Sequence, residues 1–295
     1  MELLKTGRII KGVGGFYTVL TEEGSRFTCK ARGLFRKNGQ TPLPGDTVEF
    51  SVDKKGEGYL KTIFERKNEL LRPAVSNVDK LLIVVSASEP LPDLELADKL
   101  LLYCFVQGIE PVLVINKCDS GESEQSLRIR NEYAPSGIVV VTVSAETGFG
   151  MEELSKLITG CTLCLAGQSA VGKSSLLNRL LGLELKTGEL SQKTERGRHT
   201  TRHAELIETP GGGLIADTPG FSLLESIPLE PEDIPRLYPE FTEIGSCRFL
   251  SCMHISEPGC AVKEAVKEGR VSKERYERYV KIANEAIEAR RHRYD

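Results

Sequence analysis

Short runs of alternating apolar and polar residues, bounded by glycine, proline and asparagine, fill the first 65 positions of the chain. Runs of this kind are typical of β-strands. The five predicted strands are residues 7–11, 16–20, 26–31, 46–52 and 59–64. Five strands in about sixty residues favour a small all-β barrel of the OB-fold type, which commonly binds oligonucleotides. An SH3-like barrel with no nucleic-acid role is the alternative.

From residue 66 the pattern becomes an alternation of apolar strands with helical stretches. The predicted strands are 80–86, 111–115, 138–143 and 161–166, and the predicted helices are 93–107, 122–133, 151–157 and one that begins at residue 173. Such alternation predicts an α/β domain of parallel βαβ units with helices on both faces of the sheet. Ligands of these folds bind beyond the carboxyl ends of the strands.

After about residue 228 the alternation stops. A segment containing proline and cysteine is followed by a charged stretch, 261–293, whose apolar positions keep helical spacing. This pattern predicts a third, small helical domain. We therefore expect a barrel over residues 1–65, an α/β domain over 66–226 and a helical domain over 227–295.

Composition supports a folded, globular protein, since 40% of the 295 residues are hydrophobic and 27% are charged. The net charge of −3 divides into +3 for residues 1–65, −9 for 66–260 and +3 for 261–295. Basic ends on an acidic body suit a polyanionic partner, although ordinary solvated surface explains them equally well. The longest apolar runs are far shorter than the ~18 residues of a membrane span, so we expect a cytoplasmic protein whose eight cysteines form no disulfides.

Residues 167–174 read Gly-Gln-Ser-Ala-Val-Gly-Lys-Ser and lie between a predicted strand and a predicted helix. This is the G-x-x-x-x-G-K-[ST] phosphate loop in its expected context. Its glycines let backbone N–H groups turn toward phosphates, Lys173 supplies a positive charge to the β and γ oxygens, and Ser174 offers a hydroxyl to Mg²⁺. The loop alone does not distinguish ATP from GTP.

The segment Asn116-Lys117-Cys118-Asp119 follows the strand 111–115 and distinguishes between the two nucleotides. A carboxylate at Asp119 can accept hydrogen bonds from guanine N1–H and N2–H₂, a pair of donors that adenine lacks. Ser144 and Ala145 follow the strand 138–143, where a backbone N–H can reach guanine O6. Together with the phosphate loop, these segments predict a GTP site.

Two further segments complete the predicted site. Asp217-Thr218-Pro219-Gly220 would place Asp217 on a Mg²⁺-bound water and the Gly220 N–H on the γ-phosphate. In the polar loop 197–201, Thr201 is the expected Mg²⁺ ligand and Thr200 the alternative. The position after Gly220, where Ras-like enzymes orient the attacking water with glutamine, is a phenylalanine, so we expect slow hydrolysis that a partner accelerates. His199 is the candidate for orienting that water, and the alternative is a surface histidine with no catalytic task.

The predicted site falls into three groups. The magnesium ligands are Ser174, Thr201 and Asp217, and the catalytic residues are Lys173 and His199. The GTP-binding residues are Asn116, Lys117, Asp119, Ser144, Ala145, Gly167, Gln168, Ser169, Ala170, Val171, Gly172, Lys173, Ser174, Ser175, Thr201, Asp217 and Gly220.

Three of the eight cysteines and one of the four histidines lie within 14 residues, as Cys247, Cys252, His254 and Cys260. Three thiolates and an imidazole form a closed tetrahedral shell, which predicts one structural Zn²⁺ rather than a catalytic one. A chance cluster of buried thiols is the alternative. The pair Cys161 and Cys164 invites a redox interpretation, but strand positions three apart point to opposite faces, so we interpret both as buried apolar residues.

The motifs run base, base, phosphate loop, switch one, switch two, whereas common GTPases begin with the phosphate loop. This circularly permuted order, with a barrel before it and a Cys/His cluster after it, resembles the ribosome small-subunit-dependent GTPase A (RsgA) family over essentially the whole chain. The resemblance implies a monomeric GTPase, with no membrane role, that binds the small ribosomal subunit and its rRNA late in assembly. It also implies subunit-stimulated hydrolysis and a histidine at position 199.

Two other functions remain open from the residues. One is a zinc-containing RNA-binding scaffold that senses GTP without significant hydrolysis, and the other is a signalling GTPase with a protein partner. The permuted order also has a mechanical consequence. Because the chain leaves the second switch directly for the C-terminal domain, we hypothesise that nucleotide state moves residues 228–295 relative to the barrel.

Overall fold

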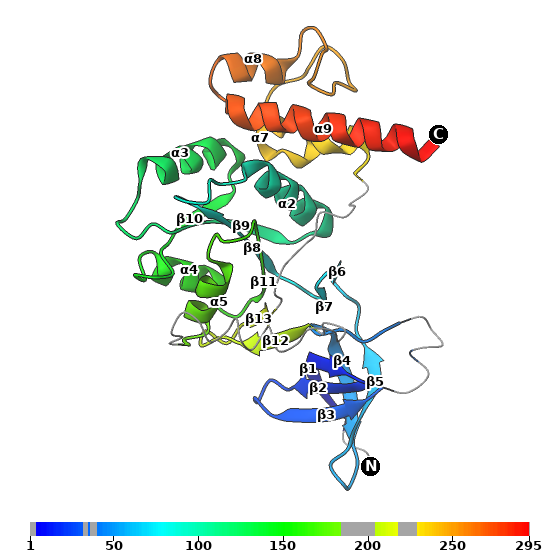
Figure 1. Ribbon diagram of the computed structural model, residues 1–295. Helices are drawn as coiled ribbons and strands as arrows, with labels where there is room; N and C mark the ends of the chain where they lie inside the picture. The colour runs from blue at the N-terminus through cyan, green and yellow to red at the C-terminus, as the bar shows by residue number, and fades with distance from the viewer. Residues whose placement is uncertain (1–3, 32–34, 36–39, 184–203, 218–228, 295) are drawn as a thin grey trace.

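The computed structural model describes residues 4–31, 35, 40–183, 204–217 and 229–294 of the 295-residue chain. Three parts follow one another along the molecule: the N-terminal barrel at one end, a central sheet covered by helices, and a helical C-terminal module at the other end (Figure 1). Within the described segments, no helix has the length and apolar character needed to cross a membrane.

The barrel is formed by β1 (Leu4–Val13), β2 (Phe16–Leu20), β3 (Arg26–Lys30), β4 (Thr47–Val52) and β5 (Gly58–Ile63). Strand β1 pairs antiparallel with both β2 and β4, while β3 pairs parallel with β5. The ring therefore closes in the order β1-β2-β3-β5-β4. Its interior is filled by alternating apolar side chains, including Ile9, Val19, Phe50 and Leu60. The prediction of a five-stranded, OB-like barrel is confirmed.

A short hairpin that the sequence pattern did not predict, β6 (Glu69–Leu71) with β7 (Ala74–Ser76), follows the barrel. The buried carboxylate of Asp46 fixes it to the barrel. Asp46 accepts hydrogen bonds from the Ser76 hydroxyl at 2.6 Å and from the Arg66 guanidinium at 2.7 and 2.8 Å. Burial of this kind is stable only with such partners, so the three residues hold the start of the central domain against the barrel.

The central sheet has the order β10-β9-β8-β11-β13-β12. Its strands are β8 (Lys80–Ser86), β9 (Glu110–Asn116), β10 (Val139–Thr142), β11 (Thr162–Ala166), β12 (Glu205–Glu208) and β13 (Leu214–Asp217). All neighbouring pairs in this part of the sheet are parallel except β12 with β13, which is antiparallel. Strand β12 also pairs with β1 at Glu205 and Lys11, so the sheet is continuous with the barrel.

Alternate residues of the parallel strands pack on opposite faces. Leu81, Ile83 and Val85 pack with helices α2 (Leu94–Gln107) and α3 (Glu124–Tyr133), and Leu82 and Val84 pack with α4 (Met151–Ile158) and α5 (Lys173–Leu180). Helices on both faces were predicted, and this arrangement is confirmed.

Cys164, within β11, and Cys161, directly before it, follow the same alternation. Cys164 is buried on the α2 side, and Cys161 packs against the opposite face. Burial raises the pKa of the Cys164 thiol to about 12, which disfavours the thiolate needed for redox chemistry.

The C-terminal module contains a 3₁₀ helix, η2 (Pro231–Leu237), and the helices α7 (Pro239–Thr242), α8 (Ala261–Lys267) and α9 (Lys273–Tyr294). The single helical stretch expected over 261–293 is therefore two helices. Gly269, with φ of 74°, ends the first, and the Ser272 side chain accepts the Arg275 N–H at the start of the second.

Candidate nucleotide site and metal centre

The loops that carry the predicted nucleotide motifs follow β9, β10 and β11, at the carboxyl edge of the central sheet. These strands lie on both sides of β8, in the order β10-β9-β8-β11. Residues 116–119, 144–148 and 167–172 thus come to one edge, although 24 residues separate the first segment from the second and 18 separate the second from the third. This edge is where α/β folds bind their ligands.

Asn116 joins the three loops. It is 2% exposed, and its Nδ2 donates to the Val171 carbonyl of the phosphate loop at 2.9 Å. Its Oδ1 accepts the Ala145 N–H at 3.1 Å. One amide side chain therefore fixes the base-reading turn, the 144–148 loop and the phosphate loop relative to one another.

Asp119 is held by the second base-reading loop. The Ser144 hydroxyl donates to Asp119 Oδ1 at 2.6 Å, and Ser144 Oγ in turn accepts the Thr147 N–H at 2.9 Å. Asp119 is exposed while Ser144 is buried, so the hydrogen bond from Ser144 orients the carboxylate from the protein side and its other side is open to solvent. A carboxylate has lone pairs for about four hydrogen bonds, which leaves acceptors for two ligand N–H groups.

The remaining residues of the 116–119 turn point in different directions. Lys117 adopts a positive φ of 66°, and its Nζ donates to the Glu89 carbonyl at 2.6 Å. Cys118 is buried in the core, where desolvation raises its thiol pKa to about 11. Cys118 is therefore a packing residue within the turn, whereas Lys117 is half-buried and Asp119 is exposed.

Two glycines shape the phosphate loop. A Cβ at Gly167, where φ is 135°, would lie 2.1 Å from the Val84 carbonyl oxygen. A Cβ at Gly172, where φ is 92°, would lie 2.4 Å from Asn116 Nδ2. Both positions combine a backbone conformation that favours glycine with a close approach that no side chain fits. The glycines are thus what allows the loop to pack against β8 and the 116–119 turn.

Lys173 lies over the loop at the start of α5. Its Nζ donates to the Gly167 carbonyl at 2.8 Å and to the Gln168 carbonyl. Burial lowers the pKa of Lys173, and none of the carboxylates in the described part of the chain pairs with its ammonium. A phosphate would supply a negative charge at this position. Ser174 and Ser175 follow in the first turn of α5 and are exposed to solvent.

Other predicted site residues are only partly described. Asp217 ends β13, which neighbours the phosphate-loop strand β11, so its backbone lies at the same edge of the sheet. His199, Thr200, Thr201, Gly220 and Phe221 lie outside the described residues. The tether between the second switch and the C-terminal module lies there as well.

The side chain of Gln168 makes contacts that the motif did not predict. Its Nε2 donates to the Leu91 carbonyl at 2.9 Å, and its Oε1 accepts the Asp93 N–H at 2.5 Å. Gln168 thus reaches out of the phosphate loop to the start of α2. Its partners are backbone groups, which leave no signature in a sequence.

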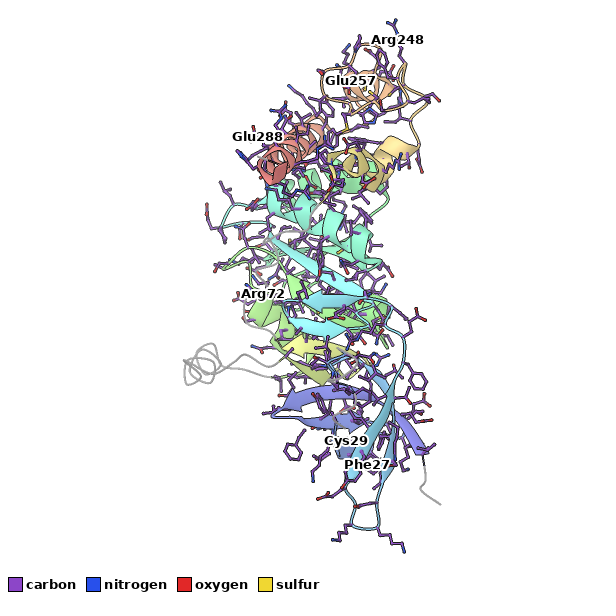
Figure 2. The ribbon with its side chains drawn as sticks, turned by 90° about the vertical axis from the view of Figure 1, so that its right-hand side faces the viewer. Phe27, Cys29, Arg72, Arg248, Glu257 and Glu288 are labelled. Carbon is purple, nitrogen blue, oxygen red and sulfur yellow. The ribbon has the colours of Figure 1, made fainter. Side chains whose placement is uncertain are left out.

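The Cys/His cluster belongs to the segment 247–260, and Figure 2 labels two other residues of this segment, Arg248 and Glu257, at the end of the molecule opposite the barrel. Ligand atoms of Cys247, Cys252, His254 and Cys260 all lie within 4.8 Å of one another. His254 Nδ1 is 3.5 Å from Cys247 Sγ and 3.3 Å from Cys260 Sγ, and these two sulfurs are 3.9 Å apart.

These distances fit a tetrahedral metal site. Tetrahedral zinc with bonds of about 2.3 Å to sulfur and about 2.0 Å to nitrogen has edges of about 3.8 Å and about 3.5 Å. The Ala261 and Lys263 N–H groups point at the sulfurs of Cys247 and Cys260, at 3.3 and 3.5 Å. Burial lowers the pKa of His254, which favours the neutral imidazole that a metal needs. The four residues can therefore hold a metal ion.

Comparison with known proteins agrees with these observations. The family model described as RsgA GTPase matches residues 63–227, and the model for the RsgA N-terminal domain matches residues 6–60. Two relatives are named small ribosomal subunit biogenesis GTPase RsgA. The one from Ruminiclostridium cellulolyticum is 45% identical, covering 95% of this chain and 93% of its own. The one from Geobacillus sp. is 46% identical, covering 98% and 99%.

Two solved structures are similar along nearly the whole chain. YjeQ from Thermotoga maritima has a TM-score of 0.84 and 38% identity, covering 97% of this chain and 99% of its own. YloQ, described as a circularly permuted GTPase, has a TM-score of 0.82 and 36% identity, covering 97% and 96%. The permuted order of the motifs, the barrel that precedes them and these matches lead to one conclusion: the chain belongs to the RsgA GTPase family and is a GTP-hydrolysing enzyme.

Proposed function

We propose that the protein binds the small ribosomal subunit and hydrolyses GTP to GDP and phosphate late in the assembly of that subunit. The relatives named for biogenesis of this subunit support the proposal. The observation that carries the nucleotide site is the Asn116 amide, bonded to both Val171 and Ala145. A role on the ribosomal subunit would place the protein in the cytoplasm.

In this proposal Asp119 accepts hydrogen bonds from guanine N1–H and N2–H₂, and a backbone N–H of the 144–148 loop donates to guanine O6. Adenine has no matching donor pair, so it would leave the Asp119 carboxylate unsatisfied. Asn116 and Lys117 support the turn that positions this carboxylate. The ordered Ser144 hydroxyl, 2.6 Å from Asp119, supports the assignment because it fixes the carboxylate before a ligand arrives.

Residues 167–175 would hold the phosphates, with Lys173 exchanging its carbonyl partners for β and γ oxygens. Ser174, Thr201 and Asp217 would hold Mg²⁺, which when bound neutralises charge that develops on the phosphates. His199 is proposed to orient the attacking water. Phe221, at the position of the Ras glutamine, cannot do so, which supports a slow intrinsic rate.

We propose that Zn²⁺ occupies the Cys/His cluster and serves the fold. Four protein ligands leave no open position for substrate, as in structural zinc sites. The Tyr276 hydroxyl donates to the His254 carbonyl at 2.6 Å, and the Tyr279 hydroxyl donates to the Met253 carbonyl. The metal loop would thus be fixed to α9.

Ribosomal RNA is the proposed partner of the barrel. Phe16 is 50% exposed with Lys30 Nζ 5.8 Å from its ring centroid, and Lys5 Nζ lies 5.4 Å from the ring centroid of Phe27. The Phe27 ring is half-buried against the barrel core, whereas Phe16 is an exposed ring beside a cation, which suits stacking with an unpaired base and contact with its phosphate.

The deciding experiment measures GTP turnover with purified small subunits, with large subunits and with neither. We expect stimulation by small subunits alone, and a reduced stimulated rate in His199→Ala. Equal turnover in all three conditions would contradict the proposal. Single-turnover hydrolysis distinguishes the enzyme from a GTP-sensing scaffold. Subunit binding that falls steeply with salt distinguishes it from a signalling GTPase with a protein partner.

A further inference from the structure

The loop from β8 to α2, residues 87–93, is held by side chains of the nucleotide motifs. Residues 88, 89, 91 and 93 are exposed, and Leu91 is 74% exposed, so the loop contributes little to the core. Lys117 Nζ donates to the Glu89 carbonyl at 2.6 Å. Gln168 bonds both the Leu91 carbonyl and the Asp93 N–H. A loop with few buried contacts depends on such hydrogen bonds for its position.

The same loop sets the start of α2. Asp93 is the N-cap of this helix, and its side chain accepts the Leu96 N–H at 2.9 Å. Gln168 therefore accepts a hydrogen bond from the backbone N–H of the N-cap residue itself. Five residues further along, less than two helical turns, lies Asp98, whose side chain is fully buried.

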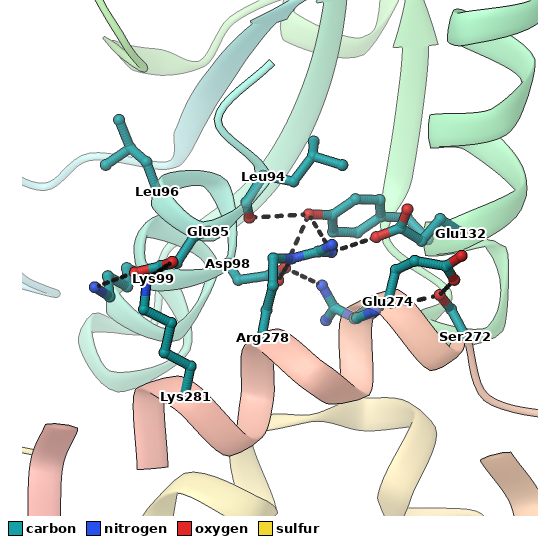
Figure 3. Close-up of polar contacts among 12 residues, drawn as sticks. Leu94, Glu95, Leu96, Asp98, Lys99, Glu132, Ser272, Glu274, Arg278 and Lys281 are labelled. Carbon is teal, nitrogen blue, oxygen red and sulfur yellow. Dashed lines mark hydrogen bonds and ion pairs between the residues drawn. The ribbon is translucent and has the colours of Figure 1, made fainter. Parts of the chain in front are cut away.

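Asp98 is the point at which the C-terminal module contacts α2. Figure 3 shows Arg278 of α9 reaching Asp98 and Glu132, and Arg278 Nε donates to Asp98 Oδ2 at 2.5 Å. Arg275 of α9 donates to Asp98 Oδ1. The Tyr133 hydroxyl donates to Asp98 Oδ1 at 2.9 Å and lies 3.4 Å from the Leu94 carbonyl.

Further contacts extend this joint along α2. Leu102 is buried within the apolar core of the C-terminal module. Lys281 of α9 donates to Glu95 at 2.5 Å, and Lys99 bonds both Glu95 and Glu285 at 2.8 Å. Helix α2 is thus packed as part of both the central domain and the C-terminal module.

We propose that α2 couples the nucleotide site to the C-terminal module, with Gln168 as the positioning residue that joins the phosphate loop to the start of the helix. A bound nucleotide that repositions the phosphate loop or Lys117 would alter the hydrogen bonds from Gln168 and Lys117 that hold residues 87–93. Because α2 is a rigid element, a shift at Asp93 is carried to Asp98 and the arginines of α9. This route uses no part of the chain between Asp217 and Leu229. It rests on the proposed nucleotide site.

Hydrogen exchange of the full chain, with and without saturating GDP and Mg²⁺, tests the coupling. We expect GDP to slow exchange at least about fivefold in residues 167–176, 89–98 and 273–283, since allosteric couplings typically begin at that size. Protection at 167–176 with no change at 273–283 would overturn the coupling alone. No protection at 167–176 would overturn the proposed nucleotide site and the coupling with it.

Variants localise the effect. At saturating GDP, Gln168→Ala should lose the response at 273–283, whereas Gln125→Ala, which removes the same side chain from α3, should retain it. A full α9 response in Gln168→Ala would refute the role of Gln168.

Coupling is reciprocal, so the far end of α2 provides a second test. Lys281→Ala, which removes an exposed contact to Glu95 without burying an unpaired charge, should change the GDP dissociation constant, and Lys267→Ala on α8 should not. Equal GDP affinity in Lys281→Ala and the unaltered chain would contradict the proposal.

Discussion

Replacing Arg275 with methionine removes the most buried cation described in the joint between α9 and the central domain. The Arg275 side chain is 2% exposed and pairs with Asp98 and Glu240, at 0% and 3% exposure. Its guanidinium carbon also lies 4.6 Å from the ring centroid of Tyr133 and 5.0 Å from that of Tyr238. Methionine keeps most of the side-chain volume but leaves both carboxylates without this partner.

Breaking a buried pair by removing one partner costs about 3–5 kcal/mol when the remaining charge is left uncompensated. Asp98 keeps its bond from Arg278, so Glu240 is the carboxylate that loses its guanidinium partner. The lost contacts with the two rings act in the same direction. We therefore expect Arg275→Met to destabilise the docking of the C-terminal module by about 3–5 kcal/mol. Arg270→Met, which removes an exposed arginine paired with Glu268, should cost less than about 1 kcal/mol.

Hydrogen exchange at residues 273–283 measures this cost, because the chain has several domains and a single unfolding free energy is not defined for it. A loss of about 3–5 kcal/mol corresponds to exchange faster by about 10²-fold or more. A change no larger than that of Arg270→Met would refute the view that these carboxylates depend on Arg275.

The pH dependence has a defined sign. Burial raises the pKa of Asp98 and of Glu132 despite the nearby arginines, so folding is favoured when these groups are protonated and loses that contribution as pH rises. Without Arg275 the pKa of Asp98 should rise further. The stability that the variant loses relative to the unaltered chain should therefore grow as the pH rises through the range in which Asp98 titrates, and a difference that stays constant from acid to alkaline pH would contradict this.

Three further predictions concern the nucleotide and metal sites. Asp119→Asn should weaken GDP binding by about 2 kcal/mol, roughly 30-fold, in competition with a fluorescent GDP, because the amide cannot accept both guanine donors. Gly172→Ala should weaken GDP binding through its positive φ and the clash with Asn116, whereas Gly245→Ala, with nothing within 4 Å, should not. The purified chain should carry one zinc, and a zinc-selective chelator should reduce helical content and protection of residues 247–267; unchanged protection would argue against a structural metal.

The sequence predicted elements well wherever apolar periodicity was sustained. Strand β8 spans Lys80–Ser86, as expected from its continuous apolar run. A strand that is buried on both faces is apolar at every interior position, so the polar residues on either side mark its ends. The antiparallel strand β12 was missed, since Glu205–Glu208 is only four residues with charged ends. The hairpin β6–β7, with three-residue strands, was missed for the same reason.

The candidate site shows a similar division. Side chains whose chemistry is encoded in their type, such as Asn116, Asp119 and Lys173, were predicted, and the structure brings them to one edge. Contacts to backbone carbonyls, such as those of Glu89 and Leu91, were not predicted, because every residue type carries the same carbonyl group. The buried position of Asp98 was also missed, since its partners lie 177 and 180 residues away.

A structure of the full chain with GDP and Mg²⁺ bound tests the central claim most directly. We expect one nucleotide to span the site, with guanine N1 within about 3 Å of an Asp119 oxygen and a β-phosphate oxygen within about 3 Å of Lys173 Nζ. A base placed away from residues 116–119, or phosphates placed outside residues 167–174, would contradict the account.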